Sequence, residues 1–282
     1  MTLAFIKMHG LGNDFVVFDA RETALSLSPA AVRAVADRRT GVGCDQLIVI
    51  EPPRTPGTAA FMRIRNADGS EVAACGNASR CVAALLMAEA GRDRVTLETR
   101  AGRLEAGRRA DGHVTVDMGV AKLDWQEIPL AGPADTNALE IGQGPLSRPV
   151  AVSMGNPHAV FFVPDAEAVA LSEVGPVLEH HPMFPERANI EVAQVLGPGR
   201  LRMRVWERGT GITRACGTGA CAVLVAAARR GLTGRSAEVV LDGGRLEITW
   251  RDDGHVLMTG PAATSFSGRL APGLLEETAV RS

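Results

Sequence analysis

Two cysteines stand out because each directly precedes an apolar run that could form a buried helix. Cys75 is followed by Gly76-Asn77, and Cys216 is followed by Gly217-Thr218. The start of a helix presents unpaired backbone N–H groups and a partial positive charge, so a cysteine there is expected to be stabilised as a thiolate. The small residues that follow would let a carboxylate approach the backbone closely.

A pair of thiols suits one class of reaction, the inversion of a carbon stereocentre. Inversion needs a base on one face of the carbon and an acid on the other. If two halves of the chain close about a pseudo-two-fold axis, Cys75 and Cys216 would flank a substrate, one as thiolate and one as thiol. A carbanion formed without a cofactor would need dense hydrogen bonding to the substrate carboxylate and exclusion of water. We therefore expect an amino-acid epimerase or racemase that needs no cofactor.

The other three cysteines are expected to be structural. Cys81 and Cys221 lie inside apolar helical runs, and Cys44 lies in a glycine-rich loop. The chain lacks paired C-x-x-C spacing and its six histidines are scattered, so we do not expect a metal site. Five cysteines in 282 residues are too few for a disulfide scaffold, and an odd number cannot all be paired. Together with a start that lacks a signal-peptide pattern, they predict a cytoplasmic protein.

The bulk composition excludes several classes of partner. The net charge of -2 gives no broad attraction to nucleic acid or to an anionic membrane. No run approaches the roughly 20 apolar residues that a membrane-spanning helix needs. Only Lys7 and Lys122 are lysines, so few residues could form a Schiff base with pyridoxal phosphate. We interpret Lys7 as a solvated residue at the end of a strand.

The sequence repeats itself with an offset of about 140 residues. The second half reproduces five segments of the first in the same order. The matched pairs are Gly12-Asn13 with Gly155-Asn156, Met62–Ile64 with Met203–Val205, Ala74–Gly76 with Ala215–Gly217, Gly102–Glu105 with Gly244–Glu247, and Asp111–Val114 with Asp253–Val256. The chain is therefore expected to contain two copies of one folding unit, joined near residue 120.

Each copy combines strands with one strongly apolar helix. The predicted strands are Phe61–Arg65, Arg94–Thr99, Val114–Met118, Leu201–Trp206, Ala237–Leu241 and Leu246–Trp250, because they mix β-branched or large apolar residues with polar ones between turn residues. The runs Cys81–Ala90 and Ala220–Ala228 are apolar all round and predict buried helices that stop at Gly91 and Gly231. Amphipathic helices are predicted at Pro29–Arg39 and Asp165–Glu179.

These patterns predict an α+β fold of two pseudo-symmetric domains. Each would be a curved mixed or antiparallel sheet wrapped around a central buried helix. The predicted N-terminal lobe spans residues 1–118 and is completed by 263–282, and the C-terminal lobe spans 119–262. The active site is expected in the cleft between them.

The motifs as a whole resemble the diaminopimelate epimerase family from end to end. The matching segments are His9–Phe15, Asp45-Gln46, Asn66–Glu71, Ala74–Asn77, Gly155–His158, Phe184–Asn189, Glu207–Gly209 and Ala215–Gly219. The resemblance implies interconversion of LL- and meso-diaminopimelate, a step of lysine and peptidoglycan precursor synthesis, without pyridoxal phosphate or metal. It also suggests a homodimer.

The resemblance assigns roles residue by residue. Cys75 and Cys216 match the acid/base pair of the family, and His158 and Glu207 match residues that tune the two thiols. The matched substrate-binding residues are Asn13, Gln46, Asn66, Gly76, Asn77, Asn156, Asn189, Glu207, Arg208, Gly217 and Thr218. Arg208 is the candidate for the distal carboxylate, because a guanidinium binds a carboxylate through two parallel hydrogen bonds.

Two other functions remain open at this point. A proline or hydroxyproline racemase would keep both cysteines but should lack Arg208 and the amide side chains, since its substrate has no second amino-acid end. A thiol-disulfide or redox-sensing protein would instead join Cys75 and Cys216 reversibly. Turnover by the reduced protein alone would separate an epimerase from a redox sensor.

Overall fold

The computed structural model describes residues 3–276, which divide into two compact units. Unit 1 contains residues up to Val116 and the segment from Pro261, and unit 2 contains Asp117–Gly260. These bounds differ by two residues from the predicted ones, and residues 277–282 of the predicted C-terminal segment lie outside the described residues. Among the described residues, no helix is long and apolar enough to cross a membrane.

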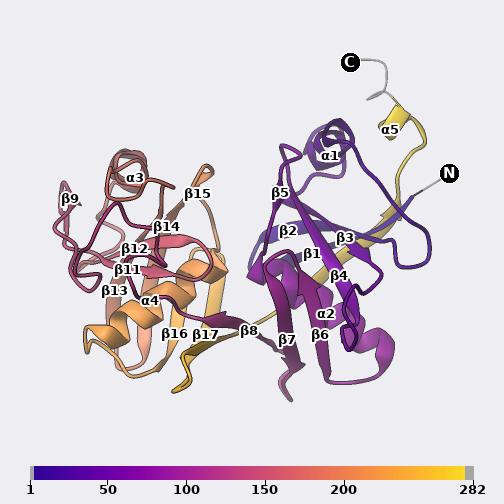
Figure 1. Cartoon of the computed structure of the whole chain (residues 1–282). Helices are drawn as coiled ribbons and strands as arrows, with labels where there is room; N and C mark the ends of the chain where they lie inside the picture. Colours follow the sequence, from indigo (N-terminus) through magenta and orange to yellow (C-terminus); the bar gives the residue numbers. More distant parts are fainter. Residues whose placement is uncertain (1–2, 277–282) are drawn as a thin grey trace. The chain divides into compact units, whose positions relative to one another are not determined.

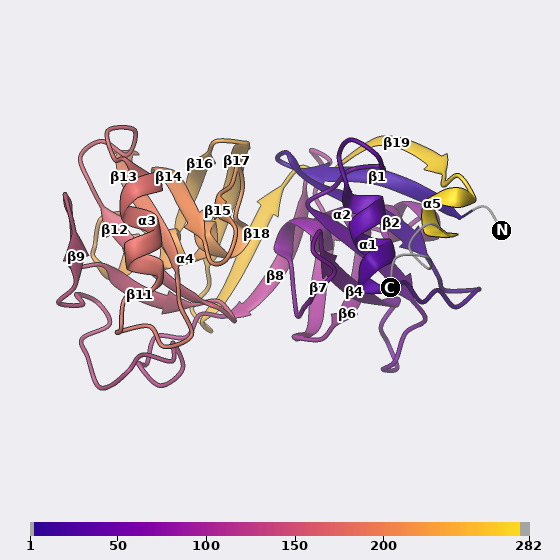
Figure 2. The same ribbon diagram turned by 90° about the horizontal axis from the view of Figure 1, so that it is seen from above.

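The sheet of unit 1 contains parallel and antiparallel strand pairs. Its strands are β1 (Ala4–Gly10), β2 (Asn13–Asp19), β3 (Gln46–Glu51), β4 (Ala60–Asn66), β5 (Glu71–Val72), β6 (Arg94–Thr99), β7 (Gly102–Arg108), the beginning of β8 (Val114–Val120) and β19 (Ala263–Arg269). The pairs β2–β3 and β4–β6 are parallel, whereas β1–β2, β3–β4, β6–β7 and β7–β8 are antiparallel. Strand β19 returns to unit 1 and lies antiparallel beside β1 (Figure 2).

Unit 2 repeats this arrangement strand by strand. Its strands are β11 (Val150–Ser153), β12 (Pro157–Phe162), β13 (Asn189–Gly197), β14 (Arg200–Glu207), β15 (Gly211–Ile212), β16 (Ser236–Leu241), β17 (Gly244–Trp250) and β18 (His255–Gly260), with a small hairpin of β9 (Gly142–Gln143) and β10 (Leu146–Ser147). The pairs β12–β13 and β14–β16 are parallel, at the same places as in unit 1. The structure thus confirms the predicted duplication and the mixed sheets.

One buried helix fills the concave side of each sheet (Figure 1). Helix α2 (Gly76–Ala90) packs on β1, β6 and β7, and α4 (Gly217–Arg229) packs on β11–β14 and β16–β18. Both helices are rich in alanine, which allows close approach of the strands. Helix α2 ends at Gly91, which has the left-handed conformation that favours glycine. Helix α4 ends one residue earlier than expected, with Arg230 rather than Gly231 as its C-cap.

The two amphipathic helices are shorter than predicted. Helix α1 (Pro29–Ala36) begins after Ser28, whose hydroxyl accepts a 3.1 Å hydrogen bond from the N–H of Ala31. It ends before Arg39 because the Asp37 carboxylate binds the following backbone N–H groups and forms a turn. Helix α3 (Leu171–Glu179) begins six residues later than predicted, since the Asp165 side chain forms a similar turn. A short helix, α5 (Gly273–Glu276), follows β19.

Candidate active site

The thiol of unit 1 lies where β2 and α2 begin. Cys75 is the N-cap of α2, in an extended conformation. Its Sγ atom lies 3.9 Å from Oδ1 of Asn13, the first residue of β2. The same oxygen accepts a 3.1 Å hydrogen bond from Nδ2 of Asn77. The structure therefore brings together three of the predicted site residues of this unit.

The amide of Asn13 is held in one orientation by a residue outside the predicted site. Its Nδ2 group donates to Oδ2 of Asp45 over 2.8 Å, which turns Oδ1 toward Cys75. Asp45 in turn accepts from the guanidinium of Arg38 at 2.7 Å. The sequence motif contained Asp45, but its type and spacing alone did not indicate that it orients a site residue.

Lys7 corrects one interpretation made from the sequence. It is 8% exposed, not solvated, and its ammonium lies 2.5 Å from the carboxylate of Asp14 and also donates to the carbonyl of Gly43. Arg38 binds the same carboxylate at 2.7 Å. Although burial opposes it, these hydrogen bonds from Arg38 and Lys7 hold the pKa of Asp14 well below its ordinary value. The cluster fixes the loop that carries Asp45.

Gln46 and Asn66 form a second polar pair of unit 1. They are direct cross-strand neighbours at the start of β3 and the end of β4. Nε2 of Gln46 donates to Oδ1 of Asn66 over 3.0 Å, and Nδ2 of Asn66 donates to Ser70 over 3.1 Å. Because β2 and β3 are parallel, their first residues lie at the same end of the sheet, so Asn13 and Gln46 share that end.

The thiol of unit 2 occupies the equivalent position at the start of α4. Cys216 is the N-cap of this helix, and its Sγ atom accepts a 3.4 Å hydrogen bond from the N–H of Gly219. Sγ also lies 3.5 Å from Oγ1 of Thr218. The last residue of β14, Glu207, hydrogen-bonds to Cys216 and accepts a hydrogen bond from the hydroxyl of Thr213.

The electrostatics at Cys216 contradict the expectation that the helix start would stabilise a thiolate there. Burial raises the pKa of the Cys216 thiol well above its usual range, and the negative charges of Glu207 and Glu191 raise it further. The hydrogen bonds from Thr218 and Gly219 act in the opposite direction but are weaker. Burial likewise raises the pKa of Glu207. At neutral pH this environment favours the protonated thiol.

Unit 2 also contains a buried pair of a carboxylate and an imidazole, Glu191 and His158. Nδ1 of His158, on β12, lies 2.7 Å from Oε1 of Glu191, on β13, and both side chains are 0% exposed. Nε2 of His158 lies 3.0 Å from Oδ1 of Asn156. Glu191 was missed in the sequence, although a single acid within the apolar strand segment 190–193 was a usable signal, since buried carboxylates are rarely without a partner.

Asn189 and Arg208 lie near the same end of this sheet. Asn189 pairs with His158 across β12 and β13, and its Nδ2 group donates to the carbonyl of Pro157 over 3.0 Å. Its Oδ1 atom accepts a 2.9 Å hydrogen bond from the backbone N–H of Arg208. The guanidinium of Arg208 is exposed and donates to the carbonyl of Glu186 at 2.9 Å. An exposed guanidinium with one hydrogen bond to a carbonyl keeps donors for a carboxylate.

The remaining cysteines lie in the apolar interior, as predicted. Cys44, Cys81 and Cys221 are each at most 2% exposed. Burial raises the pKa of Cys44 to about 11 and that of Cys81 to about 12, so neither thiol is ionised at neutral pH. Within residues 3–276, no three His, Cys, Asp or Glu side chains are grouped in a way that could hold a metal ion.

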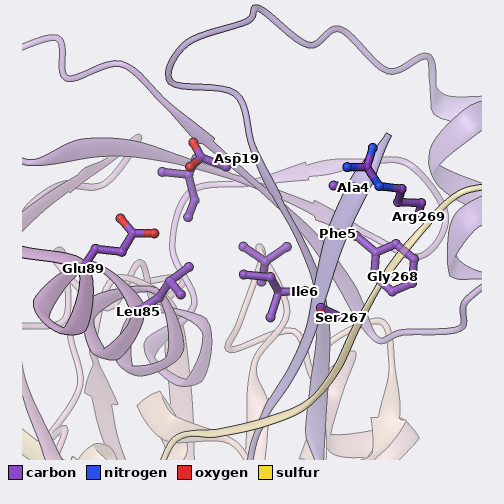
Figure 3. Close-up of a pocket in the computed structure, with 11 residues that line it drawn as sticks. Ala4, Phe5, Ile6, Asp19, Leu85, Glu89, Ser267, Gly268 and Arg269 are labelled. Carbon is purple, nitrogen blue, oxygen red and sulfur yellow. The ribbon is translucent and has the colours of Figure 1, made fainter. Parts of the chain in front are cut away.

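Unit 1 also contains a hollow of about 380 Å³ that is separate from these polar groups (Figure 3). Phe5 and Ile6 of β1 and Leu85 of α2 supply apolar walls, and Asp19 and Glu89 lie at its edge. Its lining includes no cysteine, histidine or amide side chain. It therefore lacks the thiols and amides that the predicted site requires.

The two units carry equivalent groups at the starts of their buried helices. In each unit a thiol caps the buried helix. An asparagine at the start of β2 or directly before β12 lies next to the thiol, either directly or through a threonine. Neither unit contains both thiols, so an inversion that used both sulfur atoms would require both units. Each helix start also directs backbone N–H groups outward, as binding of a carboxylate requires.

Comparison with known proteins identifies the family. The sequence model described as diaminopimelate epimerase matches residues 5–123 and 150–265. A diaminopimelate epimerase of Rhodospirillum centenum is 65% identical over 275 residues, which cover 98% of this chain and 94% of the relative. One of Acidiphilium cryptum is 59% identical over 271 residues, covering 96% and 97%. The chain belongs to the diaminopimelate epimerase family. Its membership confirms the resemblance drawn from the motifs and makes the chain an isomerase of lysine biosynthesis.

Solved structures of lower identity share the fold. A hydroxyproline epimerase from Agrobacterium vitis is 17% identical with a TM-score of 0.68, covering 96% of this chain and 93% of that one. A phenazine biosynthesis protein from Enterococcus faecalis is 13% identical with a TM-score of 0.67, covering 96% and 100%. The predicted fold class is therefore confirmed, and the proline-type enzymes are related to this chain through fold alone.

Proposed function

We propose that this chain interconverts LL- and meso-diaminopimelate by moving the α-proton between Cys75 and Cys216 on opposite faces of the substrate carbon. The observation that carries the proposal is the position of the two cysteines. This chain is a member of the family, and each of its two cysteines caps the central helix of one of the two repeated units. The proposal requires the units to close on the substrate, because water must leave the site of the carbanion.

The two thiols have different resting states in this scheme. The raised pKa of Cys216 makes it the thiol that donates a proton at the start of a turnover. Cys75 lies beside the neutral amides of Asn13 and Asn77 and is assigned as the resting base. After turnover their states are exchanged, so each cysteine serves as the acid in one direction and as the base in the other.

The substrate is held by backbone groups at one end and by side chains at the other. The N–H groups of Gly76-Asn77 and Gly217-Thr218 bind the α-carboxylate, with the positive ends of both helices adding favourable charge. Arg208 binds the distal carboxylate through its guanidinium. The remaining contacts come from the predicted amides and acid at the ends of the strands, Asn13, Gln46, Asn66, Asn156, Asn189 and Glu207.

His158 and Glu207 are assigned as the groups that tune the thiols. Glu207 hydrogen-bonds to Cys216, and burial raises the pKa of Glu207, so this carboxyl lies where it can influence the protonation of the sulfur. His158 lies one hydrogen bond further away, behind Asn156. We further propose that the enzyme acts as a homodimer in the cytoplasm, without a cofactor, and also serves peptidoglycan precursor synthesis.

The test is turnover of the purified, reduced protein. We expect LL-diaminopimelate to be converted to a mixture with the meso form, measured by chromatography that resolves the two. L-proline, the substrate class of the related racemases, should remain unchanged. Conversion of proline without conversion of diaminopimelate would overturn the assignment. Oxidation followed by re-reduction is the control for a redox function, because only the reduced protein should turn over.

A further inference from the structure

Glu191 is a fully buried carboxylate to which no role has been assigned. Its Oε1 atom lies 2.7 Å from Nδ1 of His158, and its Oε2 atom is buried without a hydrogen-bond partner among the described residues. A buried oxygen without a partner is costly. A neutral apolar residue in β13 would avoid that cost. A buried acid at this position therefore requires an explanation, and the contacts of His158 provide one.

Four hydrogen bonds connect Glu191 with the thiol of Cys216. Glu191 binds Nδ1 of His158 at 2.7 Å, and Nε2 of His158 lies 3.0 Å from Oδ1 of Asn156. Nδ2 of Asn156 donates to Oγ1 of Thr218 over 3.4 Å, and Oγ1 lies 3.5 Å from Sγ of Cys216. All five side chains belong to unit 2.

The direction of these hydrogen bonds follows from the burial of the pair. Because Glu191 and His158 are both 0% exposed, a net charge on the pair is costly, so the pair holds two protons in total. If one of these protons lies between Oε1 and Nδ1, the other is on Nε2. Nε2–H then donates to Asn156, whose Nδ2–H donates to Thr218, whose hydroxyl proton is left to donate to Sγ.

We propose that Glu191 is a positioning residue, which holds the ring of His158 so that this chain of donors ends on the sulfur of Cys216 and stabilises its thiolate. The inference rests on the proposed function, in which Cys216 becomes a thiolate in every turnover. No proton passes along the chain in this account. The chain supplies a hydrogen bond to the sulfur after the thiol proton has left for the substrate.

A close contact at the start of α4 supports this role. A Cβ atom on Gly219 would lie 2.8 Å from Oε1 of Glu191 and 3.3 Å from Sγ of Cys216. The glycine therefore leaves the space that both the carboxylate and the sulfur occupy. The charged groups that interact with His158 are Glu191 on β13 and Glu207 at the end of β14, whereas its paired neighbour on β11, Val152, is apolar.

The test measures the pH midpoint of thiolate formation at Cys216 from its ultraviolet absorbance, with the Cys216→Ala variant as the blank. A charge effect alone predicts that Glu191→Leu lowers the midpoint, since it removes a negative charge near the sulfur. The positioning role predicts the opposite, a rise of about one pH unit, because the final donor is lost. Glu191→Gln can still donate to Nδ1 and should not raise the midpoint. A lowered midpoint in Glu191→Leu overturns the proposal.

Two further measurements keep the proposal testable. Thr218→Val should raise the midpoint by a similar amount, and adding Glu191→Leu to it should produce no further rise, because both act on one chain. Independent, additive rises would contradict the proposal. Glu179→Leu is the matched control, since Glu179 is also buried in unit 2 but binds Trp206 and Gly209 instead, and it should leave the midpoint unchanged.

Nitrogen-15 NMR of the unsubstituted protein measures the protonation of His158 directly, so it does not depend on whether a variant folds. We expect Nε2 of His158 to carry a proton, and an unprotonated Nε2 would overturn the proposal. Neither this measurement nor the absorbance titration depends on turnover. A protein that fails to convert diaminopimelate but shows these signatures would therefore contradict the proposed function alone.

Discussion

The side-chain oxygen of Asn13 lies 3.9 Å from the sulfur of Cys75. The sulfur of Cys216, in contrast, is surrounded by two carboxylates, a hydroxyl and a backbone N–H group. The repeated units therefore place equivalent thiols in unlike environments, one lined by neutral amides and one by acids. An epimerase whose substrate has two different configurations at the reacting carbon has no need for two identical bases, and this difference allows one thiol to be the donor at rest.

The orientation of Asn13 can be tested through Asp45. Asp45→Ala removes the acceptor that holds Nδ2 at 2.8 Å and leaves the amide held only through its Oδ1 atom, by Asn77. Loss of about one hydrogen bond predicts a fall of roughly fivefold to tenfold in kcat/KM for diaminopimelate. Asp19→Ala removes an exposed carboxylate at the other end of β2, which pairs with Arg21, and serves as the control. Equal effects of the two substitutions would contradict the assigned role of Asp45.

The close contact at Gly219 predicts a loss of activity without a matching loss of helix stability. Alanine favours a helix by about 1 kcal/mol over glycine. Gly219→Ala nevertheless places a Cβ atom 2.8 Å from the carboxylate of Glu191. We expect kcat to fall by at least about tenfold, because the thiol and its neighbours must shift. Gly234→Ala, where a Cβ would have no neighbour within 4 Å, is the matched control and should retain full activity. Full activity in Gly219→Ala would show that the site tolerates this crowding.

The buried cluster around Lys7 predicts a specific loss of stability in acid. Hydrogen bonds from Arg38 and Lys7 lower the pKa of Asp14 from 3.8, against the effect of burial. The ionised carboxylate therefore stabilises the fold above about pH 4, and this contribution is lost as the pH falls through the lowered pKa. Lys7→Met should reduce the free energy of unfolding at neutral pH by about 3 kcal/mol and weaken its dependence on pH in this range. Denaturant unfolding at a series of pH values measures both, and an unchanged value at neutral pH would show that this buried cluster does not stabilise the fold.

Arg208 should decide recognition of the distal carboxylate. Its guanidinium makes one described side-chain hydrogen bond, to the carbonyl of Glu186, and has further donors for the substrate. Arg208→Lys keeps the charge but loses the two-pronged geometry, so we expect KM for diaminopimelate to rise about tenfold or more. Arg200→Lys, on an exposed guanidinium elsewhere in unit 2, is the control. A substitution at Arg208 that changed kcat with KM unaltered would place this residue in the chemical step instead.

The sequence predicted the architecture well because repetition and periodicity can be seen directly in the order of the residues. Matched segments separated by about 140 residues implied two units, and alanine-rich runs bounded by glycine implied the central helices. The ends of the outer helices were less accurate, since the aspartates at 37 and 165 form turns through their side chains. Such a turn and a continued helix differ little in free energy, so composition alone does not predict which of the two forms.

The site was predictable where the residue type itself carries the chemistry, and less so where neighbours determine it. Cys75 and Cys216 follow from position alone, whereas the amide and acid assignments depended on the family resemblance. The expected thiolate at Cys216 was wrong because burial and two carboxylates outweigh the helix start, and neither is visible locally in the sequence. Glu191 and Lys7 were misjudged for the same reason, since their partners come from other strands and loops.

The most direct test of the two-sulfur mechanism compares Cys75→Ala and Cys216→Ala in deuterium oxide. Each substitution removes one of two groups that every inversion needs, so neither variant should convert LL- to meso-diaminopimelate, with losses of at least about a thousandfold. The transfer of solvent deuterium to the α-carbon, followed by NMR, shows whether the remaining sulfur still removes the proton. Inversion at the unsubstituted rate by either variant would contradict the account.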